Sequence, residues 1–260
     1  MRLLAEIAGY GPTLVTLSGG VDSSLVLAAA VRALGLDRTA AVTAVSPAVP
    51  RADRDQAAAL AAHLGVRHFE VPTGELSVAG YQANGADRCY FCKTTLATAA
   101  RALADELGWP AIATGTHADD LTAGFRPGIA AAAERGARTP LADTGIGKAG
   151  IRRIARDWGL PTWDRPAAPC LSSRVAYGIP ISRTRLARIE AAEAVLRTLL
   201  PRVRDLRVRD LGDSARVEVD PGLVQAVRRT PGLREALAAF GDIPFEVAPF
   251  RSGSLNDLLP

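Results

Sequence analysis

The chain has 260 residues, of which 48% are hydrophobic, enough for one α/β domain and a smaller second domain. The formal net charge is +4, yet only two of the 31 basic residues are lysines, so we attribute the excess to arginine-rich coding rather than to nucleic-acid binding. No apolar run of membrane-spanning length lacks a charge, no signal-peptide pattern begins the chain, and three cysteines do not suit a disulfide framework; these features predict a cytoplasmic protein.

The first predicted strand, residues 12–17, runs into a glycine-rich stretch that a helix over 22–35 follows. The stretch reads Ser18-Gly19-Gly20-Val21-Asp22-Ser23-Ser24. Adjacent glycines let the backbone approach an anion, and the first helical turn offers unpaired N–H groups and the positive end of the dipole. The three serines add hydroxyl donors, and no Walker A lysine follows. We predict a phosphate-binding loop, with an ordinary glycine-rich turn as the alternative.

The next elements alternate between strands and helices. Strands are expected at 40–46, 66–71 and 111–114, and helices over 51–64, 89–107 and 148–158. This order predicts a doubly wound parallel sheet, whose ligands bind beyond the carboxyl ends of the strands. Gly115, Asp119 and Asp120 leave the fourth strand at that edge. Carboxylates here suit Mg²⁺ on ATP phosphates, with Asp22 as a further candidate, although helix capping is the alternative.

A proline-dense segment, Pro161 to Pro180, follows, and we interpret it as an ordered functional loop because it holds Trp163, Cys170 and Tyr177. Beyond it the patterns predict a smaller α+β part. Its expected elements are helices over 183–200, 221–229 and 231–240, a hairpin of 206–209 with 215–219, and a strand at 243–247. We therefore divide the chain into domains 1–165 and 166–260.

The cysteines form a C-x-x-C pair, Cys89 and Cys92, and a third residue, Cys170, in the proline-dense segment. The pair alone could be a redox couple, half of a zinc site or two ordinary thiols. Three thiolates without a fourth suit an iron–sulfur cluster with one open iron. Alternatively Cys170 is a nucleophile beside a structural pair, or the three are unrelated buried residues.

The glycine-rich stretch resembles the PP-loop of ATP pyrophosphatases, which implies ATP cleavage between the α and β phosphates. Further segments look like the LarE family of ATP-dependent sulfur transferases, and the resemblance spans nearly the whole chain. The matching segments are Asp87–Lys93, Gly115–Asp120, Arg126-Pro127-Gly128, Pro169–Gly178 and Arg251–Asn256.

This family builds the nickel-pincer cofactor of lactate racemase and its relatives. The resemblance implies that ATP adenylates a carboxylate of pyridinium-3,5-biscarboxylic acid mononucleotide and that sulfur displaces AMP to give a thiocarboxylate. ATP, Mg²⁺ and a small nucleotide substrate are implied partners, with sulfide or cysteine as the sulfur donor. Sulfur comes either from a 4Fe-4S cluster on Cys89, Cys92 and Cys170, which we favour, or from sacrifice of Cys170 itself.

The resemblance also assigns residues. It places Asp22, Ser23 and Cys170 in catalysis, Arg174, Arg207 and Arg209 at the substrate phosphate or carboxylates, and Glu218 at a divalent cation; a solvated surface is the alternative for these four charged residues. His117 and Gly124 depart from the family pattern, which puts the metal contacts and substrate in question. Family members are oligomers. Other readings are a tRNA thiolation enzyme, another PP-loop adenylating or amidotransfer enzyme, and a nucleotide-binding regulator that has lost catalysis.

Overall fold

The computed structural model describes residues 2–122 and 127–255, so Gly124, Arg126 and Asn256 of the motifs above lie outside the described residues. The chain packs as two units, each with its own core. Unit 1 comprises Met1–Glu75 and Cys89–Ala168, and unit 2 comprises Leu76–Arg88 and Pro169–Pro260. We expected a single boundary near residue 165. The structure also assigns an earlier segment, Leu76–Arg88, to the C-terminal unit.

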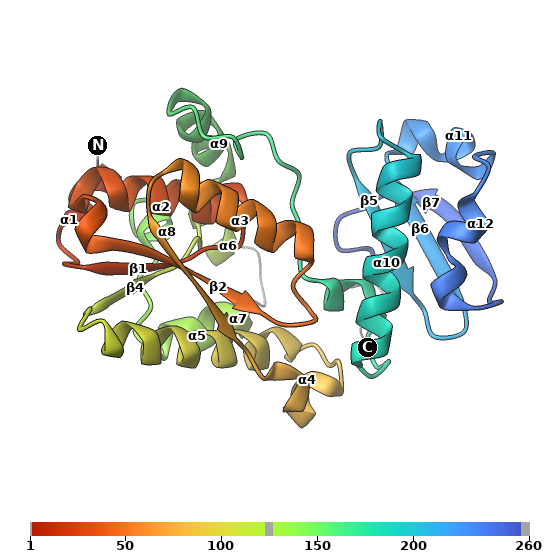
Figure 1. Cartoon of the computed structure of the whole chain (residues 1–260), viewed down its shortest axis with the longest axis horizontal. Helices are drawn as coiled ribbons and strands as arrows, with labels where there is room; N and C mark the ends of the chain where they lie inside the picture. Colours follow the sequence, from red (N-terminus) through yellow and green to blue (C-terminus); the bar gives the residue numbers. More distant parts are fainter. Residues whose placement is uncertain (1, 123–126, 256–260) are drawn as a thin grey trace. The chain divides into compact units, whose positions relative to one another are not determined.

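Unit 1 is built on a four-stranded parallel sheet in the order β3-β2-β1-β4 (Figure 1). Its strands are β1 (Thr13–Thr16), β2 (Thr39–Val45), β3 (Arg67–Pro72) and β4 (Ala111–Ala113). In the register, Thr13 of β1 lies opposite Thr39 on one side and Ala111 on the other. The strand order reverses between β1 and β4, and such a switch point is where a doubly wound sheet binds its ligand.

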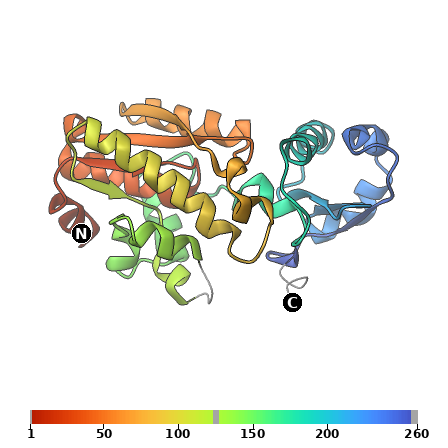
Figure 2. The same ribbon diagram turned by 90° about the horizontal axis from the view of Figure 1, so that it is seen from below.

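Helices cover both faces of this sheet (Figures 1 and 2). One face carries α2 (Val21–Leu34) and α3 (Arg51–His63), with α1 (Arg2–Ala8) and α9 (Lys148–Asp157) beside α2; the other carries α5 (Arg88–Glu106). Alternate residues of β1 serve the two cores, since Val15 packs among residues of α2 and α3 while Leu14 packs with Ala100 and Ala104 of α5. The predicted doubly wound α/β fold is confirmed.

Three short helices between β4 and α9 were not predicted. They are α6 (Ala118–Thr122), α7 (Pro127–Ala133) and α8 (Pro140–Asp143). Each has at most two turns, too short for a hydrophobic period to be visible in the sequence. They matter here because α6 carries the predicted acidic pair and α7 packs on the start of α5.

Unit 2 is the predicted α+β part. Strands β5 (Leu206–Asp210) and β6 (Ala215–Val219) form the antiparallel hairpin, and β7 (Phe245–Pro249) runs parallel beside β6. Helix α10 (Arg183–Leu199) packs on β5, and Asp210 fixes the two together because it accepts hydrogen bonds from Arg185 and Arg188 at 2.8 and 2.5 Å.

The two helices expected over 221–229 and 231–240 are shorter than predicted. The structure has α11 (Val224–Arg228) and α12 (Leu233–Ala236), each joined to a 3-10 turn. Pro221 begins the first segment, and Gly232 takes a left-handed φ of +82° at the start of the second. A proline and a glycine at these points shorten a regular helix.

Segment Leu76–Arg88, which includes α4 (Ala79–Gln82), is held in unit 2 by polar contacts. The Tyr81 hydroxyl and Ser172 Oγ lie 2.5 Å apart, and Asn84 donates to the carbonyls of Ala176 and Ile179, both at 2.8 Å. Contacts across about 90 residues leave no periodic signal in a sequence. Within the described ranges, no helix is both long and apolar enough to cross a membrane.

Candidate functional site

The stretch Ser18–Ser24 forms the turn between β1 and α2 and is closed by its own hydrogen bonds. The Ser18 N–H donates to Ser23 Oγ at 3.2 Å, and the hydroxyls of Ser23 and Ser24 donate to the Gly20 carbonyl at 3.2 and 2.7 Å. Both Ser23 and Ser24 are buried. Their hydroxyls therefore shape the loop, whereas we had expected them to donate to phosphate. The backbone N–H groups of the first turn of α2 have no intrahelical acceptors and suit an anion.

A polar relay supports the residue before this loop. Thr43 Oγ1 on β2 donates to the Leu17 carbonyl at 2.7 Å and lies 2.8 Å from His68 Nε2 on β3. Because Thr43 gives its one hydroxyl proton to Leu17, His68 Nε2 must be the donor in the second contact. Burial lowers the pKa of His68, which favours the neutral ring with its proton on Nε2. No sequence pattern indicated this relay.

The loop after β4 packs directly on the start of α2, as the shared sheet edge predicts. A Cβ built on Gly115 would lie 2.7 Å from Ser23 N and 3.1 Å from the Asp22 carbonyl carbon. Real Cβ atoms do not come that close to backbone, so only glycine allows this approach. The two loops of the switch point therefore meet at Gly115.

We predict that Gly115→Ala displaces the first turn of α2. The expected cost is about 1–3 kcal/mol of stability from overpacking, and ATP affinity should fall at least about tenfold because the N–H groups move. Titration calorimetry with ATP and a melting curve measure both. Gly74→Ala is the matched control, since nothing lies within 4 Å of the Cβ it would add. Wild-type ATP affinity in G115A would contradict the prediction.

The acidic pair of α6 makes capping contacts. Asp120 Oδ2 accepts the His117 N–H at 3.2 Å and lies 3.4 Å from His117 Nε2. Asp119 Oδ2 accepts the Lys148 N–H at 2.7 Å, so it caps α9 rather than its own helix. Gly147 lies so close to Asp119 that a Cβ would collide with the carboxylate. The capping alternative describes both residues, and Asp119 joins α6 to α9.

The start of α9 places a lysine on the loop. Lys148 Nζ donates to both carboxylate oxygens of Asp22, each at 2.7 Å. Side chains of Lys148 and Asp22 keep 35% and 27% of their exposed area, so the pair is open to a ligand from solvent. Lys148 and Lys93 are the only lysines of the chain. Lys148 therefore adds a cation to the anion-binding end of α2.

The C-x-x-C pair begins α5. Cys89 is exposed, Cys92 is half-buried, and neither forms a disulfide. A Cβ on Gly128 of α7 would meet Lys93 Cγ at 2.9 Å and Cys89 O at 3.3 Å, so the Pro-Gly motif permits close packing of α7 on this turn. Cys170 belongs to unit 2. The described residues contain no group of three histidine, cysteine or acidic side chains placed to hold a metal ion.

Unit 2 gathers the predicted substrate-binding arginines. All are buried, with 2% exposure for Arg174, 3% for Arg207 and 5% for Arg209, so the alternative of a solvated surface is wrong for them. Arg174 donates to both oxygens of Glu193 on α10, at 3.0 and 3.3 Å. Arg209 donates to Glu218 Oε2 through two nitrogens, at 2.9 and 2.6 Å.

Glu218 is also buried, at 1% exposure, and not an exposed strand residue. Its second oxygen accepts from Ser254 Oγ at 2.7 Å, so Ser254 of the C-terminal Arg251–Asn256 motif helps to hold this carboxylate. The guanidinium of Arg207 lies 5.3 Å from the centre of the Phe250 ring. Burial, and then the charge of Arg174, lowers the pKa of Arg207 to about 10. A bound anion would relieve that cost of burying a cation.

The loop that carries Cys170 is clamped from two sides. Ser173 Oγ donates to the Cys170 carbonyl at 2.7 Å, and Arg174 donates to the same carbonyl at 3.0 Å. Arg88 donates to the Ser172 carbonyl at 3.0 Å and lies 5.3 Å from the Tyr177 ring. Arg88 is 4% exposed and precedes the C-x-x-C pair directly. Its part in holding this loop was not evident from the sequence.

We predict that Glu218→Gln destabilises the full chain by about 3 kcal/mol, because an amide NH₂ would face the buried guanidinium of Arg209. Glu246→Gln is the matched control on the same sheet, where the pair with Arg216 is partly exposed and should be worth less than about 1 kcal/mol. Melting temperature measures both variants. An equal fall in melting temperature in the two variants would show that burial does not increase the contribution of the Arg209–Glu218 pair to stability.

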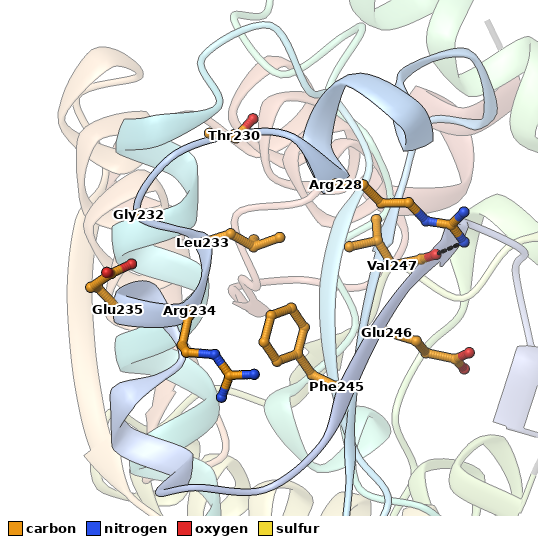
Figure 3. Close-up of a pocket in the computed structure, with 9 residues that line it drawn as sticks. All are labelled: Arg228, Thr230, Gly232, Leu233, Arg234, Glu235, Phe245, Glu246 and Val247. Carbon is orange, nitrogen blue, oxygen red and sulfur yellow. Dashed lines mark hydrogen bonds between the residues drawn. The ribbon is translucent and has the colours of Figure 1, made fainter.

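A pocket on unit 2 lies away from these residues (Figure 3). Leu233, Phe245 and Val247 provide its apolar lining, Arg228 donates to the Val247 carbonyl at 2.8 Å, and the Arg234 guanidinium lies 5.2 Å from the Phe245 ring. None of the predicted site residues lines it.

The parallel sheet, the loop at its switch point and the cationic start of α9 define an ATP-using protein of the PP-loop class. Residues 8–83 match the asparagine synthase family model, which covers the sheet's first three strands and this loop.

Two relatives match this chain over nearly its full length. The pyridinium-3,5-bisthiocarboxylic acid mononucleotide synthase of Lactiplantibacillus plantarum is 32% identical over 99% of this chain and 93% of its own length. The chain belongs to the LarE family of ATP-dependent sulfur transferases. An uncharacterized protein of Synechocystis sp., slr1717, is 40% identical over 95% of this chain and 92% of its own length. Protein MJ0830 of Methanocaldococcus jannaschii, also uncharacterized, is 29% identical over 63% of the chain.

Proposed function

We propose that the protein adenylates a carboxylate of pyridinium-3,5-biscarboxylic acid mononucleotide with ATP and converts it to a thiocarboxylate, as a step in nickel-pincer cofactor biosynthesis. The observation that carries the proposal is the cationic loop network, Lys148 on Asp22 at the start of α2, in a chain similar over its full length to the Lactiplantibacillus synthase.

The activation step uses groups of unit 1. The substrate carboxylate oxygen attacks the α-phosphorus of ATP, the bond to the β-phosphate oxygen breaks, and pyrophosphate leaves. N–H groups at the start of α2 and the ammonium of Lys148 neutralise charge that grows on the leaving phosphates. Mg²⁺ enters with ATP on its phosphates, and Asp22 and Asp119 are the carboxylates at this edge that could support it. The product is an acyl adenylate, whose AMP is a far better leaving group than oxide.

Unit 2 supplies recognition of the substrate. Guanidinium groups of Arg174, Arg207 and Arg209 are preorganised for an anion because Glu193 and Glu218 hold two of them rigidly. Planar guanidinium groups bind phosphate and carboxylate oxygens in pairs, and this substrate carries both kinds of anion. A sulfur nucleophile then attacks the activated carbonyl carbon, and the C–O bond to AMP breaks.

We propose two alternative sources for that sulfur, and one experiment distinguishes them. Cys89 and Cys92 lie one helical turn apart, and with Cys170 they match three thiolate ligands in number and type, although the described residues show no three-ligand group. A 4Fe-4S cluster bound there, which we favour, would supply a sulfide at its open iron. Otherwise Cys170 gives its own sulfur: its thioester breaks at the Cβ–S bond, with loss of the Cα proton, and leaves dehydroalanine.

The proposed function is tested by AMP release. Full-length protein, purified anaerobically, is incubated with ATP and MgCl₂, with and without the mononucleotide substrate. AMP and pyrophosphate should appear in equal amounts and only when substrate is present. Iron and acid-labile sulfide in the purified protein identify the cluster form, whereas loss of one H₂S mass from the protein identifies sacrifice of Cys170. AMP release that ignores the substrate would contradict the proposal.

A further inference from the structure

A guanidinium from the proline-dense segment lies against the phosphate-binding loop. Arg165 Nη1 donates to the Gly19 carbonyl at 2.5 Å, and its Nη2 donates to Asp53 Oδ1 at 2.6 Å. Asp53 is in the first turn of α3 and 8% exposed. All three residues belong to unit 1. The sequence motifs gave Arg165 no role.

The contact fixes the direction of one peptide group. The C=O and N–H bonds of a trans peptide point in opposite directions. With the Gly19 carbonyl held by Arg165, the Gly20 N–H points in the opposite direction within the peptide plane, away from Arg165. Gly19 has φ +74°, which glycine adopts without strain, but a glycine backbone has many other accessible conformations, so the hydrogen bond from Arg165 selects one of them. We propose that Arg165 is a positioning residue that orients the loop for the phosphates of ATP.

We call the link from Arg165 to Gly19 and Asp53 the clamp, and two further contacts support it. The backbone of α3 abuts Gly19, since a Cβ there would lie 2.7 Å from the Asp53 carbonyl oxygen and 3.0 Å from Arg165 Nη1. Arg152 of α9 donates to the carbonyls of Trp163 and Arg165 at 3.0 and 2.8 Å, which holds the backbone from which Arg165 extends. Loop, α3 and α9 thus share one hydrogen-bonded support.

The inference rests on ATP use by the loop and not on sulfur transfer, so its test uses pyrophosphate and adenosine as probes. Calorimetry on the full chain compares wild type with Arg165→Met and Arg165→Lys. In R165M, pyrophosphate affinity should fall at least about tenfold while adenosine affinity stays unchanged. R165K keeps the charge but offers a single donor group, and should recover part of the loss. Arg153→Met, an exposed position on α9, is the matched control for lost charge.

A merely structural role for Arg165 predicts another pattern. If R165M lost affinity for both probes equally, or bound pyrophosphate as wild type does, the positioning role would be overturned. If R165M does not fold, R165K and Asp53→Asn decide, because each weakens the clamp without emptying its space. Wild-type protein that binds no pyrophosphate and releases no AMP would overturn ATP use itself, and the clamp's purpose with it.

Discussion

Replacing Lys148 by methionine is expected to slow AMP formation by about 10²–10³-fold, the usual cost of removing one preorganised donor from a transition state that gains charge. The stability of the chain should change little, because the Lys148–Asp22 pair is partly exposed. The rate is measured by AMP release at saturating substrate. Lys148→Arg, which retains a cation, should recover part of it.

The scarcity of lysine offers an independent measurement of the same claim. Acetic anhydride can label only two lysine side chains, at Lys148 on the loop and at the exposed Lys93 of α5. Mass spectrometry of peptides should show that ATP protects Lys148 and leaves Lys93 reactive. A normal AMP rate in K148M, or labelling of Lys148 that ignores ATP, would remove this residue from the phosphate site.

The largest expected effect on the product comes from Cys170→Ser. Loss of the sulfur nucleophile or cluster ligand should reduce thiocarboxylate formation at least about 10³-fold. Substrate-dependent release of pyrophosphate, with one equivalent of acyl adenylate, should persist for one turnover, because the activation groups Asp22 and Lys148 lie in unit 1 and are untouched. Thiocarboxylate, acyl adenylate and pyrophosphate are quantified from the same reaction by chromatography and mass spectrometry.

Cys92→Ser is the control that separates the two sulfur sources. In the cluster form it should lose both iron and sulfur transfer, as C170S does. In the sacrificial form it should keep both product formation and the loss of H₂S mass from Cys170. Thiocarboxylate formed at the wild-type rate by C170S would contradict any role for this thiol.

The fold was predictable because its signals are local. Apolar runs that end at glycines predicted the bounds of the four parallel strands to within two residues. The Ser18–Ser24 stretch alone was enough to predict the phosphate-binding loop. Packing of Gly115 on α2 also agrees with the prediction, since strand ends of a parallel sheet share one edge. Elements whose pattern is shorter than two turns, such as α6 and α8, were missed.

The sequence pointed to candidate site residues but not to the side chains with which they pair. The Arg-x-Arg of β5 was predicted to bind substrate, and that role stays a prediction. The pairing of Arg209 with Glu218, which Ser254 also contacts, depends on strands and a terminal segment that meet only in the folded chain. The same holds for Arg165, which reaches Gly19 across 146 positions of sequence. A hydrophobic period reports which face of an element is buried, and it carries no information about which charged groups will pair there.

The central claim is that the substrate carboxylate is adenylated before sulfur replaces it. Substrate labelled with heavy oxygen in its carboxylates tests this most directly, with AMP examined by mass spectrometry after one turnover. Attack by the carboxylate on the α-phosphorus followed by sulfur displacement predicts AMP that carries one heavy oxygen atom. Unlabelled AMP would contradict the account, because it would mean that the α-phosphorus never bonded to the substrate carboxylate.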